Sequence, residues 1–207
     1  LCDSRSRTNI RAVADAWETE PSWGVRMVMA RALGDCGAPE AAKVLAEKLL
    51  SESDPRLAKY ITEACGKYRD EGIAAALRTW LSRDELPYLG HAGALGALAG
   101  HHKEEDLPLL VSATSDQQGW GIVRRGALMA LGKHRSEQAM EAISSRIAYG
   151  SEKTTIRCAA LGALGSNAHW LDKAHRGKAL ELLSDLVRDP CVSVCAAAGG
   201  ALQALGE

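Results

Sequence analysis

Histidines and acidic residues cluster at the centre of the chain, where a pair of histidines is followed by three acidic residues: His101, His102, Glu104, Glu105 and Asp106. Imidazole and carboxylate groups are the ligands of many zinc sites. Adjacent histidines point in different directions, however, and this run fixes no ligand spacing. A solvated turn between two helices is the alternative interpretation, and we favour it.

A second group of possible metal ligands lies nearer the C-terminus. His169 and His175 precede Cys191 and Cys195, and the two cysteines are four residues apart, so they can share one face of a helix. A zinc site can be imagined from these residue types. Buried thiols beside a solvated loop are the alternative, which we again favour. We therefore predict no bound metal and no cofactor.

No complete set of catalytic residues is legible. No histidine is followed by Glu, and neither a Ser-His-Asp nor a Cys-His arrangement can be read. The glycine pairs lie inside or after helical patterns rather than after strands, so no phosphate-binding loop is indicated. We predict that the chain is not an enzyme in its own right.

Composition excludes several classes of partner. Lys and Arg number 25 against 26 Asp and Glu, which argues against a strongly basic surface for nucleic acid. No apolar run approaches the ~20 residues of a membrane span. Six cysteines without a CxxC pair favour a reducing, cytoplasmic setting. Because the chain begins with Leu1 rather than Met, we expect a fragment, a processed chain or a partial gene.

An internal repeat is the strongest signal in the sequence. Six segments align on residues spaced by 32, 33, 33, 33 and 38 positions: Leu33, Cys65, Leu98, Leu131, Leu164 and Leu202. The long last interval holds an insertion at Ser166 to Lys173. Such a period indicates stacked supersecondary units, none of which can bury its apolar face alone.

Each aligned segment has the period of a helix. Val123, Ala127 and Leu131 recur every four residues and form one apolar stripe. A glycine follows four of the segments, at Gly34, Gly66, Gly132 and Gly165, and we interpret these glycines as left-handed helix ends. Asp-Pro pairs at residues 54–55 and 189–190 indicate helix starts.

Second amphipathic stretches lie between these helices, and no strand pattern competes with them. The low aromatic content of 4% leaves Ala, Leu and Gly to fill the core, which suits closely packed helices. We predict an all-α fold, an α-α superhelix of about six helix pairs in a single domain over residues 1–207. The predicted pairs are residues 8–35, 39–67, 70–99, 104–132, 136–165 and 174–206.

The period, the Asp-Pro starts and the V-R-x-x-A-x-x-A-L-G helices resemble HEAT repeats of the short type called HEAT-like or PBS-lyase-like. The resemblance implies an armadillo-like solenoid over nearly the whole chain and says little about function. Among HEAT-like enzymes, deoxyhypusine hydroxylase needs His-Glu metal motifs, which are absent here. No residue set identifies the bilin site of a phycobilin lyase, and the charge balance argues against a DNA-glycosylase relative.

A narrower resemblance concerns residues 20–34, 91–98 and 106–110. They look similar to the C-terminal HEAT-like region of some M1-family zinc aminopeptidases. The catalytic HExxH motif of that family is absent, so the resemblance implies an accessory region and carries over no catalytic role.

Surface positions can be read from the repeat register. Three of the six repeats have an arginine seven positions before the matched residue, namely Arg26, Arg124 and Arg157. These arginines form either a ligand-binding ladder or, as we favour, ion pairs with the adjoining repeat. The second helices of HEAT solenoids line the concave face, so positions nine, six and two before each matched residue should point there. They include the candidate partner-binding residues Met27, Arg31, Arg56, Lys59, Glu63, Arg125 and Met129.

The side chains predicted on the concave face are long and charged in the first two repeats and small in the last two, which include Gly162 and Gly200. A solvated surface without a ligand is the alternative. Exposed tryptophans are plausible interface anchors, although Trp more often seals a small-residue core. We predict a non-catalytic interaction module that binds a protein or peptide partner, or another domain of the same polypeptide. An accessory region of an M1-like enzyme is the runner-up, and a lyase-like HEAT enzyme is third.

Overall fold

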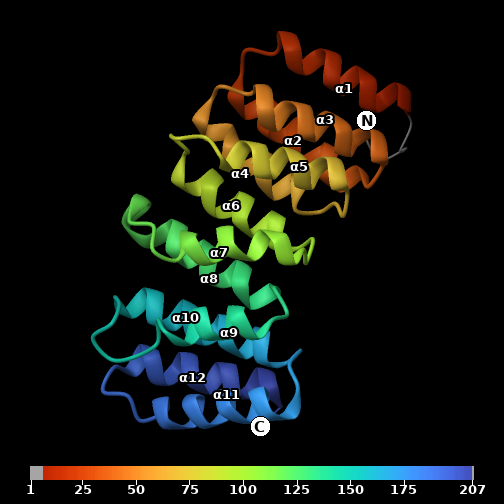
Figure 1. Cartoon of the computed structure of the whole chain (residues 1–207). Coiled ribbons are helices and arrows are strands. Elements are labelled where there is room, and N and C mark those ends of the chain that lie inside the picture. The colour runs from red at the N-terminus through yellow and green to blue at the C-terminus, as the bar shows by residue number, and fades with distance from the viewer. Residues whose placement is uncertain (1–6, 207) are drawn as a thin grey trace. The chain divides into compact units, whose positions relative to one another are not determined.

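The computed structural model describes residues 7–206, which form twelve α-helices (Figure 1). The predicted all-α repeat fold is confirmed; the first residue, Leu1, lies outside the described part. The helices are α1 Arg7–Thr19, α2 Trp23–Cys36, α3 Pro39–Ser51, α4 Pro55–Cys65, α5 Glu71–Leu81, α6 Tyr88–Ala99, α7 Leu107–Ala113, α8 Ile122–Lys133, α9 Glu137–Ser144, α10 Thr154–Ala168, α11 Lys173–Leu186 and α12 Val192–Leu205. Short 3-10 turns, Glu104–Asp106 and Gln118–Gly121, precede α7 and α8.

The chain divides into two compact units, here called unit 1 (residues 1–101) and unit 2 (residues 102–207). Unit 1 contains α1 to α6, and unit 2 contains α7 to α12. The prediction of a single domain therefore stays a prediction. No helix in the described part of the chain combines the length and apolarity needed to cross a membrane.

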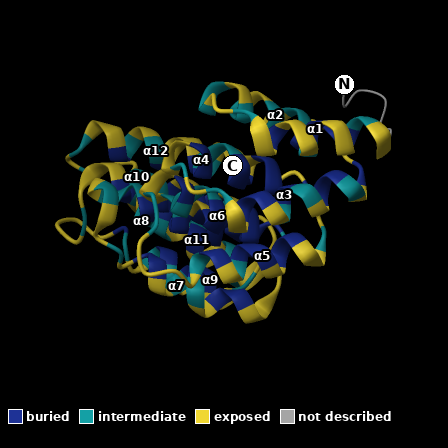
Figure 2. Ribbon diagram, turned by 90° about the horizontal axis from the view of Figure 1, so that it is seen from above, coloured by how far each residue is buried: buried dark blue, intermediate teal, exposed yellow. Residues whose placement is uncertain are grey.

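Within each unit the helices stack in order of their place in the repeat. In unit 1 the second helices α2, α4 and α6 pack in succession, and α3 packs on α5. In unit 2 the second helices α8, α10 and α12 do the same, while α9 and α11 pack against them. Figure 2 shows buried and exposed residues alternating around individual helices, as an amphipathic repeat requires.

The repeat register defines the core. Five of the six matched residues are completely buried, namely Leu33, Cys65, Leu98, Leu131 and Leu164. The sixth, Leu202, is only half-buried. It lies on α12, which no further helix follows within residues 7–206, so nothing later in the described chain stacks over it.

The glycines at the ends of the second helices have a different role from the one we predicted. None of Gly34, Gly66, Gly132 and Gly165 has a positive φ, and three of them lie inside their helices. Each packs against an alanine of the next second helix instead. A Cβ on Gly34 would lie 2.9 Å from the Cβ of Ala64, and one on Gly132 would lie 2.9 Å from the Cα of Ala163. These glycines permit close approach of helices.

Of three predicted helix boundaries, one agrees with the structure and two differ from it. Pro55 opens α4, and Asp54 caps it by accepting a hydrogen bond from the Arg56 N–H, as expected. Pro190 does not open a helix, because α12 begins at Val192 with Cys191 as its N-cap. The predicted insertion at Ser166 to Lys173 comprises the last three residues of α10, which ends at Ala168, then a turn and the first residue of α11.

Asn167 gives the extension of α10 to Ala168 a physical reason. Its side chain is fully buried, and its amide nitrogen donates to the carbonyl oxygens of His134, at 2.7 Å, and of Leu131, at 3.3 Å. These carbonyls lie at the end of α8, where a helix leaves its last acceptors without intrahelical partners. The extension of α10 thus supplies a hydrogen-bond donor to the carbonyl groups at the end of α8.

Candidate interaction surface

The predicted partner-binding residues lie on the outward side of the second helices. None of them is buried: Arg31, Arg56, Glu63, Arg125 and Met129 are exposed, and Met27 and Lys59 are half-buried. Five of the seven belong to α2 and α4 of unit 1 and the other two to α8 of unit 2. We call the outward face of α2, α4 and α6 the second-helix surface of unit 1.

Aromatic rings join the predicted cations across this surface. The guanidinium carbon of Arg56 lies 4.8 Å from the centre of the Trp23 ring, and that of Arg31 lies 5.1 Å from the centre of the Tyr60 ring. Both contacts link α2 to α4. The ammonium group of Lys59 lies 5.6 Å from the Tyr60 ring. An exposed cation–π contact of this kind contributes about 0.5–1 kcal/mol of interaction free energy and restrains the long side chain.

Met27 belongs to the same face of α2. It lies four residues after Trp23 and four before Arg31, and residues four apart on a helix are neighbours on its surface. The half-buried Met27 therefore shares the face of α2 that carries Trp23 and Arg31, whose side chains both contact α4.

Carboxylates neutralise part of this charge. Asp54 accepts hydrogen bonds from Nε and Nη2 of Arg56, the latter at 2.7 Å, and this pairing holds the pKa of Asp54 below its ordinary value. Glu63 lies 3.7 Å from Lys59 in an exposed pair, which contributes at most a few tenths of a kcal/mol. None of the ion pairs of the described residues involves Arg31. Three cations thus face two carboxylates.

A shallow apolar pocket of about 410 Å³ adjoins the cations. Tyr88 and Leu89, at the start of α6, are 46% and 44% exposed and form one side of it. The full lining comprises Trp23, Pro55, Arg56, Lys59, Tyr60, Pro87, Tyr88 and Leu89. The second-helix surface of unit 1 is therefore charged over α2 and α4 and apolar toward α6.

Sequence reasoning considered the tryptophans as possible interface anchors, but it placed none of Trp23, Tyr60 and Tyr88 on this surface. Two of them lie at helix starts and one beside Lys59, but a sequence does not show which ring meets a cation on another helix. The tryptophans differ widely: Trp17 and Trp80 are buried, Trp23 is half-buried, and Trp120 and Trp170 are 92% and 53% exposed.

The arginines seven positions before the matched residues form ion pairs, as we favoured. Arg26 bonds Glu52 at 2.7 Å, Arg124 bonds Glu152 at 2.5 Å, and Arg157 bonds Asp189 at 2.5 Å. Each carboxylate lies 26 to 32 residues further along the chain, in the adjoining repeat. These arginines tie repeats together and do not form an open ladder.

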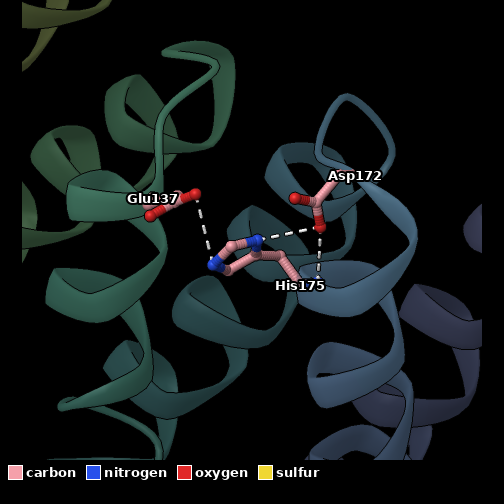
Figure 3. Close-up of side chains that lie close together, drawn as sticks. All are labelled: Glu137, Asp172 and His175. Carbon is pink, nitrogen blue, oxygen red and sulfur yellow. Dashed lines mark hydrogen bonds and ion pairs between the residues drawn. The ribbon is translucent and has the colours of Figure 1, made fainter.

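The possible metal ligands are distributed differently from either predicted group. Among residues 7–206, the only His, Cys, Asp and Glu side chains gathered closely enough for one ion are Glu137, Asp172 and His175 (Figure 3). The thiol of Cys195 donates to the Asp189 carbonyl at 2.9 Å, and that of Cys191 lies 4.0 Å from the Thr154 hydroxyl. His175 thus meets two carboxylates and not the cysteines.

The comparisons with known proteins agree with the helix pairs. Residues 10–96 match the family model of HEAT repeats, so the helix pairs of unit 1 are HEAT repeats, and the predicted HEAT-type recognition is confirmed there. The structure of human deoxyhypusine hydroxylase in complex with glycerol is similar over 96% of both chains, with 14% identity and a TM-score of 0.47, a likeness too low to bear on activity. No curated protein matches. The M1 resemblance stays a prediction.

Proposed function

We propose that this helical-repeat protein is a non-catalytic scaffold that binds an acidic protein segment carrying an apolar or aromatic side chain. The binding site is the second-helix surface of unit 1. The observation that carries the proposal is the junction of a cationic strip, Arg31, Arg56 and Lys59, with the pocket beside Tyr88 and Leu89. One partner segment can engage both.

Preorganisation supports this role. Asp54 occupies the Nε and Nη2 edge of Arg56, and the guanidinium carbon lies 4.8 Å from the centre of the Trp23 ring, so the side chain is already held before a partner arrives. Ordering a free arginine on binding costs roughly 0.5–1.5 kcal/mol, which a fixed side chain avoids. Trp, Tyr and Arg are also the residues that dominate binding energy at protein interfaces.

Charge complementarity selects the kind of partner. With three cations against two carboxylates, this strip favours an acidic segment over a basic one. The attraction acts near the rim in high dielectric, so it tunes association rate and salt dependence more than final affinity. The apolar pocket supplies the remaining contact area. The segment can belong to another protein or to another domain of the same polypeptide, since the surface selects side-chain chemistry.

Titration of the full chain with fluorescent peptides tests the proposal. One peptide carries Asp and Glu around a central Leu and Trp; two matched peptides replace the acids by Lys or the apolar pair by Ala. We expect saturable binding of the first peptide, which weakens as salt is raised, and about tenfold weaker binding of both others. Equal binding of all three peptides would contradict the proposed chemistry.

Charge reversal on the protein provides the matched control. We expect Arg31→Glu with Lys59→Glu to weaken the acidic peptide about tenfold or more. Arg125 in the fourth repeat corresponds to Lys59, because both lie six residues before the matched residue. Arg125→Glu reverses the charge at this position. That variant should bind the peptide within about twofold of the unmodified chain, because α8 carries none of the described aromatic–cation contacts of α2 and α4. Equal losses in both variants would mean that binding is a general charge effect.

A further inference from the structure

A histidine at the start of α11 in unit 2 is enclosed by two carboxylates from different helices. The Nδ1 atom of His175 lies 2.9 Å from Oδ1 of Asp172, and its Nε2 atom lies 3.3 Å from Oε1 of Glu137 (Figure 3). The imidazole side chain is 22% exposed, whereas both carboxylates are largely exposed. Every atom of the ring that can bind a proton therefore faces an acceptor.

The fold fixes the first of these contacts. Asp172 is the N-cap of α11, and its Oδ1 also accepts the backbone N–H of His175 at 2.9 Å. That hydrogen bond and the N-terminus of α11 both stabilise the charged form of the carboxylate. A charged Asp172 selects the tautomer with the proton on Nδ1, because only that tautomer donates to it.

The remaining ring nitrogen then presents a lone pair to Glu137. A lone pair facing a carboxylate oxygen at 3.3 Å is repulsive unless a positive charge lies between them. Either a proton or a metal ion can supply that charge. Two ligands bound at about 2.0–2.1 Å to one tetrahedral ion lie roughly 3.3–3.4 Å apart, and the observed Nε2 to Oε1 separation of 3.3 Å agrees with this geometry.

The local charge favours a cation. Glu137 and Asp172 together carry two negative charges, while the N-termini of α9 and α11 each contribute roughly half a positive charge. Arg135 lies over the Trp170 ring, so the guanidinium group of this neighbouring residue is engaged in another contact. Lys173 is exposed, where water and salt screen its charge.

We propose that Glu137 and His175 Nε2 bind a divalent transition-metal ion of the zinc class, with Asp172 as the positioning residue that orients the ring. One ligand atom from each of the three residues lies within 4.8 Å of the other two. Imidazole selects zinc-class ions over magnesium and calcium. Two protein ligands on an exposed surface leave the other positions to water, so binding is weaker than at a closed structural zinc site. The ion links the start of α9 to the start of α11.

Calorimetric titration of the untagged full chain with zinc chloride near neutral pH tests the site. The expected result is one saturable ion per chain, which magnesium does not displace. His175→Gln should abolish saturable binding, and Glu137→Gln and Asp172→Asn should each weaken it by about tenfold to a hundredfold. Unfolding should shift to higher temperature with zinc in the unmodified chain and not in the His175→Gln chain.

Matched controls exclude other ligands. His169→Gln removes an exposed histidine of the same turn, and Cys191→Ser removes the nearest accessible thiol further along the chain; both variants should bind zinc like the unmodified chain. Cobalt substitution should give no thiolate charge-transfer band. The proposal is overturned if the unmodified chain binds zinc no better than the His175→Gln chain, or if Cys191→Ser abolishes binding.

Discussion

Units 1 and 2 use the same repeat framework, but the outward side chains of α2 and α4 in unit 1 differ in chemistry from those of α10 and α12 in unit 2. In unit 1 the outward positions of α2 and α4 carry Arg31, Arg56 and Lys59, with Trp23 and Tyr60 against them. In unit 2 the outward positions of α10 and α12 include Gly162 and Gly200, where an added Cβ would meet no atom within 4 Å. The difference shows that the stacking of second helices leaves their outward chemistry free to vary.

What the units share is the contact between successive second helices. Gly34 and Gly66 in unit 1, and Gly132 and Gly165 in unit 2, each pack against an alanine one repeat later. At Gly34, Gly132 and Gly165 an added Cβ would lie 2.9–3.1 Å from that alanine, so the contact there requires a residue without a side chain, whereas at Gly66 it would lie at an ordinary 3.4 Å. The comparison therefore separates glycines that the packing demands from glycines that it does not, and substitutions can test that separation.

The largest effect should come from the buried matched residues. Leu98→Ala in unit 1 and Leu131→Ala in unit 2 each remove a side chain with no exposed surface. We expect each variant to lose about 2–5 kcal/mol of unfolding free energy, from lost burial and the cavity left behind. Urea denaturation followed by circular dichroism measures the loss. An unchanged midpoint in either variant would show that the repeat register is wrong in that unit.

Paired glycine substitutions in unit 2 should have opposite signs. In Gly132→Ala the new Cβ would lie 2.9 Å from the Ala163 backbone, so we expect a loss of about 1–3 kcal/mol from overpacking. In Gly162→Ala the new methyl meets nothing, and the helix gains up to about 1 kcal/mol from the better propensity of Ala. Thermal unfolding of both variants decides the matter. Destabilisation by both would mean that α10 has a partner on its outward face.

Acid should act on unit 2 through Asp189. The hydrogen bond from Arg157 holds the pKa of Asp189 below its ordinary value, and both side chains are almost fully buried. A lowered folded-state pKa contributes stability above the unfolded-state value, and this stability is lost as the pH falls through the folded-state value. We expect the melting temperature to fall below about pH 4, and Asp189→Asn to remove part of that dependence. Parallel pH curves for both chains would refute this assignment.

The smallest effect on stability, but a clear difference between the units, concerns thiol chemistry. Burial raises the pKa of Cys65 in unit 1 to about 12. Backbone N–H groups at the start of α12 lower the pKa of Cys191 in unit 2. Among the cysteines of residues 7–206, we expect iodoacetamide at pH 8 to label Cys191 first and Cys65 only after unfolding, as read by peptide mass spectrometry. Early labelling of Cys65 in the folded protein would contradict its burial.

The sequence alone was sufficient for the helix pairs, because the apolar period and the spacing of the matched residues define them. The sequence was misleading for Gly132, because a glycine near a helix end is compatible both with a left-handed cap and with close helix packing. Only the distance to Ala163 distinguishes the two roles. The sequence also gave no sign that His175 contacts Glu137. Glu137 lies 38 residues earlier and is brought close by the packing of α9 and α11 with α10.

The candidate surface was predictable in part for a similar reason. Arg31 and Lys59 follow from the register, because the register fixes which side of a helix points outward. Trp23 and Tyr60 do not, because contact between a ring and a cation depends on side-chain torsions and on the distance between two helices. Charge could therefore be read from the sequence, while the apolar pocket could not.

Nuclear magnetic resonance of the tryptophan indole N–H groups tests the central claim most directly. The acidic, aromatic peptide is titrated into the full chain, and the indole signals are assigned by single Trp→Phe substitutions. We expect a saturable shift of the Trp23 signal, in the pocket of unit 1, with little change at Trp120 and Trp170 of unit 2. A larger shift at Trp120 or Trp170 than at Trp23 would contradict it.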